Sequence, residues 1–175
     1  MLYIATTRFN ESTWHQNCSW RERQEWKGCI YGTPTLIKET IPIGMSIAIL
    51  EMHNDCNTIM GIGIISNNIE KKAKYSLYEW GNYNRFIYKS KYRIDRDSCN
   101  EEELKIIHIL EILVFKGSRH LKRGQGITIL PSWISKNKHI EFSGIIREMF
   151  LTRFKTPLLC IEDEMENFQL KTLLI

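Results

Sequence analysis

The residues best suited to chemistry in this chain form a short basic segment, Phe115–Gly126. Between Lys116 and Gly126 it holds four permanent cations, three glycines and no acidic residue. Arginine and lysine form charge-assisted hydrogen bonds with phosphate oxygens, and glycines let backbone amides approach an oxyanion. The pattern predicts a phosphate-binding loop, and the alternative is a solvated basic turn between two strands. The predicted nucleic-acid contacts of this loop are Lys116, Arg119, His120, Lys122, Arg123, Gly124 and Gln125.

A second basic segment, Arg85–Arg96, strengthens the prediction of a nucleic-acid partner. Its basic residues alternate with aromatic ones, and such a mixture is typical of an electrostatic groove with stacking platforms. The alternative is that its tyrosines are half-buried packing residues. We predict contacts by Arg85 and Lys89 from this segment, and by Arg8 from the polar end of an opening strand.

The five tryptophans are the third chemical feature, because several stand in polar surroundings without periodicity. An aromatic wall with a few polar groups holds an unstacked base, since stacking supplies affinity and hydrogen bonds identify the base edge. For Trp20 and Trp80 core packing is an equal alternative, and Trp14 and Trp26 are expected to pack on the first helix. The predicted base pocket consists of Thr7, Trp20, Thr33 and Trp80.

A catalytic alternative lies in the segment Glu51–Cys56, which brings an acid, a histidine and a thiol to one hairpin turn. A metal-dependent nuclease using the Glu51 and Asp55 carboxylates is the leading enzyme hypothesis. Asn and Asp are, however, expected in a turn for backbone reasons, and no nucleophile elbow, Walker loop or dinucleotide fingerprint is present. A third hypothesis is a protein-interaction module of viral or regulatory type.

Metal binding has weak support in the sequence. His15 and Cys18 form one loose knuckle, and structural zinc sites usually have two. We therefore expect no metal ion. We also expect no cofactor and no catalytic residue, so the favoured function is non-catalytic binding of RNA or modified DNA.

The elements that must position these residues follow from hydrophobic patterning. Ile41–Ile65 is the clearest signal, a hairpin whose two arms are apolar at nearly every position, as in strands covered on both faces. Gly61 and Gly63 suggest a bulge or close backbone packing within it. The other expected strands are Leu2–Thr7, Arg85–Ile94, Ile107–Phe115, Ile127–Leu130 and Thr156–Ile161, and the expected helices follow Asn10 or Ser12 and span Glu141–Phe154. For Ile107–Phe115 the alternative is a helix that starts at the acidic residues Glu101–Glu103, and the β-branched isoleucines favour the strand.

Composition sets the class of protein. Of 175 residues, 43% are hydrophobic and 25% charged, and the net charge is +4, so any attraction of a polyanion must come from local clusters. An odd number of cysteines and an amino terminus without signal-peptide features predict an intracellular protein, cytoplasmic or nuclear and not secreted. The longest apolar run, Ile41–Leu50, is too short to span a membrane. We expect a single domain over residues 1–175 and no membrane partner.

Four short pieces follow one another along the chain among the expected elements: Thr6-Thr7-Arg8, Tyr31-Gly32-Thr33-Pro34, Gly61-Ile62-Gly63 and Arg119-His120-Leu121-Lys122. Their order, together with that of the expected strands and helices, resembles the PUA-like superfamily, nearest its EVE and YTH branches. The resemblance implies an α+β fold, namely a compact PUA-like β-barrel of about five to six strands with two or more flanking helices. It also implies a binder of RNA or of a modified base. The bias toward isoleucine, asparagine and lysine is similar to that of proteins from AT-rich genomes, including large DNA viruses.

Overall fold

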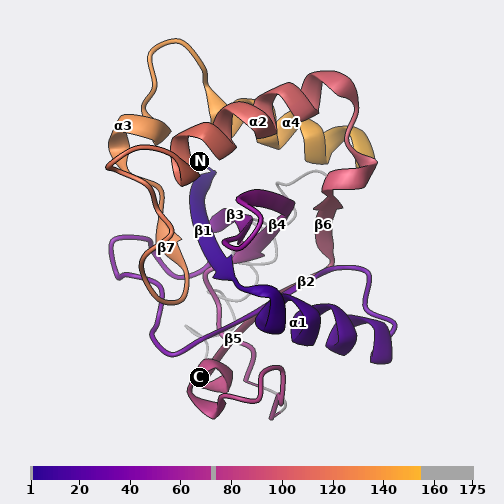
Figure 1. Cartoon of the computed structure of the whole chain (residues 1–175). Coiled ribbons are helices and arrows are strands. Elements are labelled where there is room, and N and C mark those ends of the chain that lie inside the picture. Colours follow the sequence, from indigo (N-terminus) through magenta and orange to yellow (C-terminus); the bar gives the residue numbers. More distant parts are fainter. Residues whose placement is uncertain (1, 72–73, 155–175) are drawn as a thin grey trace, which may run out of the picture.

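The computed structural model describes residues 2–71 and 74–154, so the strand expected at Thr156–Ile161 lies outside the described residues. Most strands come in the first part of the chain, with α1 between β1 and β2, and the described part ends on helix α4 (Figure 1). The elements are β1 Tyr3–Phe9, α1 Glu11–Arg23, β2 Cys29–Thr33, β3 Ser46–His53, β4 Thr58–Ser66, η1 Gly81–Asn84, β5 Phe86–Ser90, β6 Tyr92–Asp95, η2 Arg96–Ser98, α2 Glu101–Phe115, β7 Thr128–Ile129, α3 Ser132–Ser135 and α4 Phe142–Arg153.

The strands form two sheets, which confirms the α+β class. The larger sheet has the order β6-β4-β3-β1-β7, and the smaller one pairs β2 with β5. In the larger sheet β1 and β3 are parallel, because the chain returns through α1 and β2 between them, and the other pairs are antiparallel. Hydrogen bonding among the described residues does not close these strands into one barrel.

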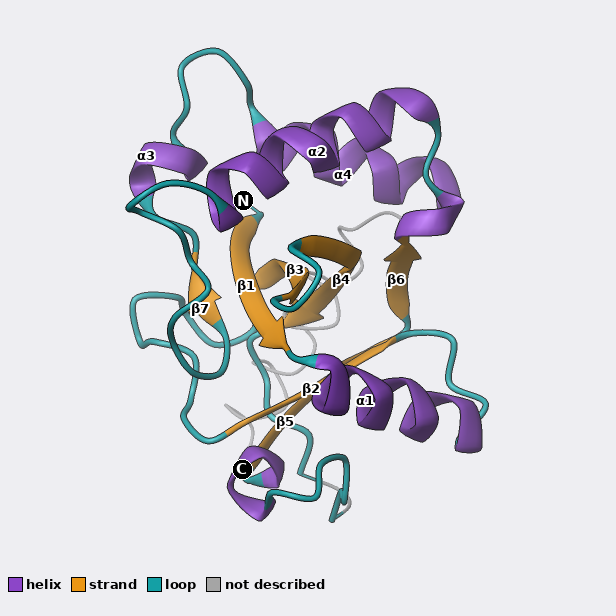
Figure 2. Ribbon diagram, viewed as in Figure 1, coloured by secondary structure: helices purple, strands orange, loops and turns teal. Residues whose placement is uncertain are grey.

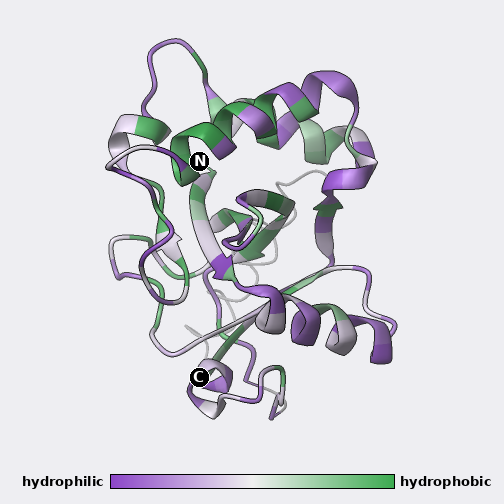
Figure 3. Cartoon of the chain, in the orientation of Figure 1, coloured by the Kyte–Doolittle hydropathy of each residue, from purple (hydrophilic) through white to green (hydrophobic). Residues whose placement is uncertain are grey.

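The five-stranded sheet is covered on both faces, as the continuous apolar arms of the hairpin predicted (Figure 2). Ala48 and Leu50 of β3 pack in one core with residues of α2 and α4. Ile47 and Ile49 point the other way, into a second core with β2 and β5. The apolar colouring of β3 and β4 in Figure 3 contrasts with the mostly hydrophilic α1 at the surface. The hairpin is thus the common wall of two cores.

The expected strand at Ile107–Phe115 is wrong, because this segment belongs to helix α2. Asn100 caps the helix by accepting a hydrogen bond from the backbone N–H of Glu103, whose side chain accepts one from the Asn100 N–H in return. Ile107, Leu110 and Val114 then recur at helical spacing and are fully buried. The capping box and the buried stripe together outweigh the β-propensity of the isoleucines.

The single strand expected at Arg85–Ile94 is also wrong, because the chain changes sheets within it. β5 pairs with β2, and β6 pairs with β4 of the larger sheet. Lys91 lies between the two strands, where the Ser90 hydroxyl accepts a hydrogen bond from the Tyr92 N–H at 3.2 Å. This change explains why the alternation of side chains is imperfect across Ser90.

The first arm of the expected hairpin is shorter than predicted, because β3 begins at Ser46 and residues 41–45 form a turn, in which Pro42 has no N–H for a ladder and Gly44 has φ of +87°. The other expected helices and strands of the described residues are found, with ends that differ by one or two residues. These are the opening strand, the helix capped by Asn10, the second arm of the hairpin, a short strand at Thr128–Ile129 and the final amphipathic helix, and the basic loop follows Phe115 as expected. In the described part of the chain, none of the helices combines the length and the apolar character needed to cross a membrane.

Helices α2 and α4 are tied to each other by a bidentate ion pair. Both Nη atoms of Arg153 donate to the Glu103 carboxylate at 2.6 Å, and Nη2 also donates to the Ser98 carbonyl. The hydrogen bonds from Arg153 lower the pKa of Glu103 more than its partial burial raises it. The stabilisation is therefore complete above the ordinary carboxyl pKa of about 4.3 and is lost as the pH falls through the lowered value.

We expect Glu103→Gln to reduce the loss of stability that the native protein suffers below about pH 4.3. Urea unfolding at neutral pH and at acidic pH measures this change. Glu102→Gln is the matched control, because Glu102 is exposed and pairs with the exposed Lys105. Equal acid sensitivity in the Glu103 variant and the native protein would show that the pair with Arg153 does not form in solution.

Candidate functional site

A cavity of about 360 Å³ lies where the end of β1, the start of α1 and the basic loop meet. The end of β1 and the start of α1 are continuous in sequence, whereas the basic loop and the residues just before β5, which form the facing wall, come from distant parts of the chain. The volume falls within the roughly 300–1,000 Å³ of small-ligand sites. Its lining residues are Thr7, Arg8, Phe9, Asn10, Ser12, Thr13, Gln16, Gly32, Tyr78, Glu79, Trp80, Tyr83, Gly124 and Gly126.

One wall of the cavity is aromatic. Trp80 stands at its rim with 73% of its surface exposed, and its ring centroid lies 6.1 Å from that of Tyr83. Tyr78 is buried behind them and meets Tyr83 edge-on at 6.2 Å. Asn84 fixes this wall, because its Oδ1 accepts from the N–H groups of Leu77 and Tyr78 and its Nδ2 donates to the Tyr78 carbonyl. An exposed tryptophan is thus held on a rigid turn.

Arg8 supplies a partly buried positive charge to the cavity. Its Nε donates to the Leu121 carbonyl, and its Nη1 donates to the Gly126 carbonyl at 3.4 Å and to Thr128 Oγ1 at 3.1 Å. All of these acceptors are uncharged, and within residues 2–71 and 74–154 no carboxylate pairs with the guanidinium. Burial lowers the pKa of Arg8, and Tyr83 opposes this effect. A cation in this state favours a ligand that brings an acceptor or a negative charge.

The basic loop forms the edge of the cavity through two of its glycines. Gly124 has φ of +129° and lies against the Arg8 guanidinium, so a side chain there would be strained. Gly126 has φ of +63°, and a Cβ at this position would lie 2.1 Å from Thr33 Oγ1. The loop is anchored on its other side, where the Lys122 carbonyl accepts a hydrogen bond from Asn54 Nδ2 at 3.0 Å. Glycines here allow the loop to pack closely against the Thr33 and Arg8 side chains.

Some of the predicted site residues meet at this cavity. Thr7, Arg8, Trp80 and Gly124 line it, and Thr33 lies directly behind Gly126, with its hydroxyl donating to the Thr35 carbonyl. The loop residues Lys116, Arg119, Arg123 and Gln125 are exposed and do not line the cavity themselves.

The other residues predicted to contact nucleic acid or a base either contact neighbouring protein groups or lie away from the cavity. Lys122 Nζ donates to Asn57 Oδ1 at 2.8 Å, and Arg119 lies 5.9 Å from the ring of Trp133. His120 Nδ1 is buried without a hydrogen-bond partner in the described structure. Arg85 is exposed and lies over the Phe86 ring. Lys89 and Trp20 do not line the cavity and lie together in a separate aromatic cluster.

The sequence interpretation missed Tyr78, Tyr83 and Gln16 as lining residues. Gln16 Oε1 accepts from the Glu79 N–H at 2.8 Å and so ties the aromatic wall to α1. A local signal for the aromatic wall was present in the sequence, because Tyr78, Trp80 and Tyr83 lie within six positions and Asn84 follows directly. An asparagine after such a run is a common device for closing a turn through backbone hydrogen bonds.

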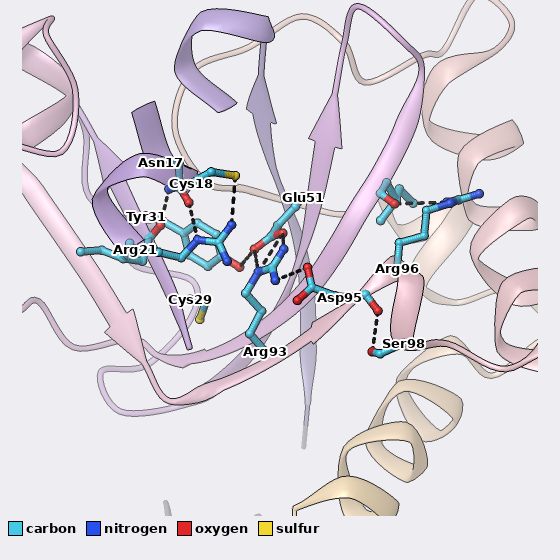
Figure 4. A network of polar contacts seen from close by, with 12 residues as sticks. Asn17, Cys18, Arg21, Cys29, Tyr31, Glu51, Arg93, Asp95, Arg96 and Ser98 are labelled. Carbon is cyan, nitrogen blue, oxygen red and sulfur yellow. Dashed lines mark hydrogen bonds and ion pairs between the residues drawn. The ribbon is translucent and has the colours of Figure 1, made fainter. Parts of the chain in front are cut away.

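The Glu51 carboxylate of the nuclease hypothesis lies in a buried network rather than in the cavity (Figure 4). It is 1% exposed and accepts hydrogen bonds from Arg93 Nη2 at 2.7 Å and from the Tyr31 hydroxyl at 2.7 Å. Asp55 instead accepts from the Glu11 N–H at 2.8 Å. Over the described ranges, no group of three or more His, Cys, Asp or Glu residues is arranged to hold a metal ion.

Comparison with known proteins found no relative of this chain: no protein-family model, no curated protein and no solved structure matches it.

Proposed function

We propose that this protein binds nucleic acid, with one unstacked base in the cavity and the neighbouring phosphates on the basic loop. The observation that carries the proposal is the meeting of Arg8, the Trp80–Tyr83 wall and the glycine edge of the loop around one cavity. A flat, exposed indole provides a stacking surface for a base. The same loop carries the exposed cations Lys116, Arg119 and Arg123, and the proposal assigns the phosphates next to that base to them.

The PUA-like assignment of the fold is part of the same proposal. It is supported by the parallel β1–β3 pair, by the β3–β4 hairpin and by the position of the basic loop beside the end of β1. The role is recognition, since the cavity groups named above bind and orient a ligand and none is a paired acid and base.

The hydrogen bonds of Arg8 indicate which bases the cavity would prefer. Its Nη2 has no hydrogen-bond partner among the described residues and lies beside Gly124 at the loop edge. Guanidinium groups pair with carbonyl and ring-nitrogen acceptors of bases, as arginine does with guanine. A base that presents a carbonyl oxygen, such as guanine or uracil, fits this donor better than adenine.

The test is binding of labelled single-stranded and double-stranded oligonucleotides, with and without base modifications, measured by fluorescence anisotropy at two salt concentrations. Trp80→Ala is expected to weaken single-strand binding roughly tenfold to hundredfold, because stacking on one aromatic residue is worth about 1–3 kcal/mol. The salt dependence should stay unchanged, because no phosphate contact is removed.

Trp133→Ala is the matched control, because Trp133 is 39% exposed, lies beside Arg119 and does not line the cavity. Replacing Arg119, Lys122 and Arg123 together by alanine should instead reduce the salt dependence across all sequences. If Trp80→Ala binds as tightly as the native protein, the cavity does not receive a base.

A further inference from the structure

A second aromatic site lies away from the cavity and surrounds a lysine ammonium. Lys89 Nζ lies 3.9 Å from the ring centroid of Trp26, 5.5 Å from that of Trp20 and 5.8 Å from that of Tyr75. We call Trp20, Trp26 and Tyr75 the ammonium cage. Ring faces attract a cation within about 6 Å through their negative quadrupole. Three rings from three segments of the chain therefore converge on one position suited to positive charge.

The cage is held in shape independently of the lysine. Trp26 Nε1 donates to the Cys29 carbonyl at 3.2 Å, so its ring orientation is fixed. Trp20 is 8% exposed and packs against Tyr75 with ring centroids 5.7 Å apart. Burial, and after it the negative charge of Glu70, raises the pKa of the Tyr75 hydroxyl. The walls are thus preorganised around the position that the ammonium occupies.

Lys89 is an imperfect occupant of this cage. Within the described residues its ammonium has no hydrogen-bond or ion-pair partner, although a primary ammonium carries three N–H donors and is strongly hydrated. An N-methylated ammonium has fewer N–H donors or none, so ring faces satisfy it more completely. The Lys89 side chain is half-buried and flexible. Its ammonium can therefore leave the cage while the Lys89 backbone stays paired with Ile30.

We propose that the ammonium cage is a binding site for an N-methylated ammonium group, which enters by displacing the Lys89 side chain. A methylated lysine of a protein and a choline group carry the same chemistry. Lys89 acts as the resident competitor, so the site binds a methylated cation and rejects unmethylated lysine. This site is separate from the nucleic-acid cavity, which shares none of its residues.

The test is titration of the full chain with tetramethylammonium, Nε-trimethyllysine amide and phosphocholine, followed through the indole N–H signals in NMR spectra. The signals of Trp20 and Trp26 should shift, and those of Trp80 and Trp133 should stay in place. The trimethyllysine and phosphocholine arms distinguish the two sources. Lysine amide and 3,3-dimethylbutanol, a neutral analogue of choline, should bind at least tenfold more weakly than the methylated cations.

Two variants test the cage and its occupant. Lys89→Ala should bind tetramethylammonium several-fold more tightly, because the competing charge is removed, and Trp26→Ala should lose binding. Trp26→Phe, which keeps a ring, and Trp80→Ala, which leaves the cage intact, should both retain it.

Three results would overturn the proposal. The first is absence of binding in both the native protein and Lys89→Ala. The second is binding in Lys89→Ala alone, which would make Lys89 a permanent part of the fold. The third is equal affinity for 3,3-dimethylbutanol, which would identify an apolar slot instead of a cation site.

Discussion

Replacing Glu51 by alanine is expected to lower the free energy of unfolding by about 3–5 kcal/mol, because it leaves a buried charge without its partner. The Arg93 side chain is 1% exposed, and its Nε and Nη2 donate to Glu51. Burial acts to lower the pKa of Arg93, but the attraction of Glu51 outweighs it and raises that pKa above its usual value. Arginine stays protonated because its ordinary pKa lies far above neutral pH, so Glu51→Ala leaves a buried cation. Among the described residues, the carboxylate that then remains in contact with Arg93 is that of the exposed Asp95.

The position of this pair makes it a link between the two sheets. Glu51 belongs to β3 and Arg93 to β6 of the larger sheet, while the Tyr31 hydroxyl reaches the carboxylate from β2 of the smaller one. A Cβ at Gly61 would lie 2.8 Å from Glu51 Oε2, and one at Gly63 would lie 2.2 Å from the Tyr31 hydroxyl. The two glycines of β4 therefore leave room for the network, and loss of Glu51 disturbs the contact between the two sheets.

Urea unfolding measures this effect, and Glu102→Gln is the control, because the exposed Glu102–Lys105 pair is worth at most about 1 kcal/mol. The triple variant Tyr31→Phe, Glu51→Leu and Arg93→Met removes both buried charges of the network and the Tyr31 hydroxyl together. It should cost much less than Glu51→Ala, since no buried group is left unpaired. A loss for Glu51→Ala as small as that for Glu102→Gln would contradict the buried pair.

The part of the fold that was predictable from sequence is the part where local signals agree with tertiary packing. Asn10 caps α1 and the arms of the β3–β4 hairpin are apolar at most positions, and in both cases the structure follows the pattern. In α2 the signals conflict, because isoleucines favour a strand whereas Asn100 and the acidic first turn favour a helix. The capping signal was the better guide, since the helical spacing of Ile107, Leu110 and Val114 agrees with it.

The candidate site was predictable only in pieces. The basic loop is continuous in sequence, so its charge and glycines were visible directly. The aromatic wall depends on hydrogen bonds from Asn84 and Gln16 that join separate segments, and no spacing rule reports such contacts. Trp20 and Trp80 looked equivalent in sequence, yet Trp20 is buried in the ammonium cage and Trp80 stands exposed at the cavity.

Arg8→Met is expected to reduce both the affinity for single-stranded nucleic acid and the order of the basic loop. The guanidinium binds the Leu121 and Gly126 carbonyls, and hydrogen bonds from a charged donor are each worth about 1.5–3 kcal/mol. Because desolvation of Arg8 offsets part of this gain, we expect a net loss of about 1–3 kcal/mol in unfolding free energy. Affinity should fall at least tenfold, since the cavity loses its charge and the loop loses its anchor.

Thr128→Val separates the two roles of Arg8. It removes one acceptor of Nη1 and leaves Nη2, which lies at the cavity, untouched. We therefore expect Thr128→Val to loosen the loop, seen as faster amide hydrogen exchange at residues 121–126, while keeping a preference for uracil or guanine over adenine. In Arg8→Met the same exchange should accelerate and the preference should disappear, because the donor that reads the carbonyl is gone. If Arg8→Met keeps that preference, another group reads the base, and Arg8 acts only as the anchor of the loop.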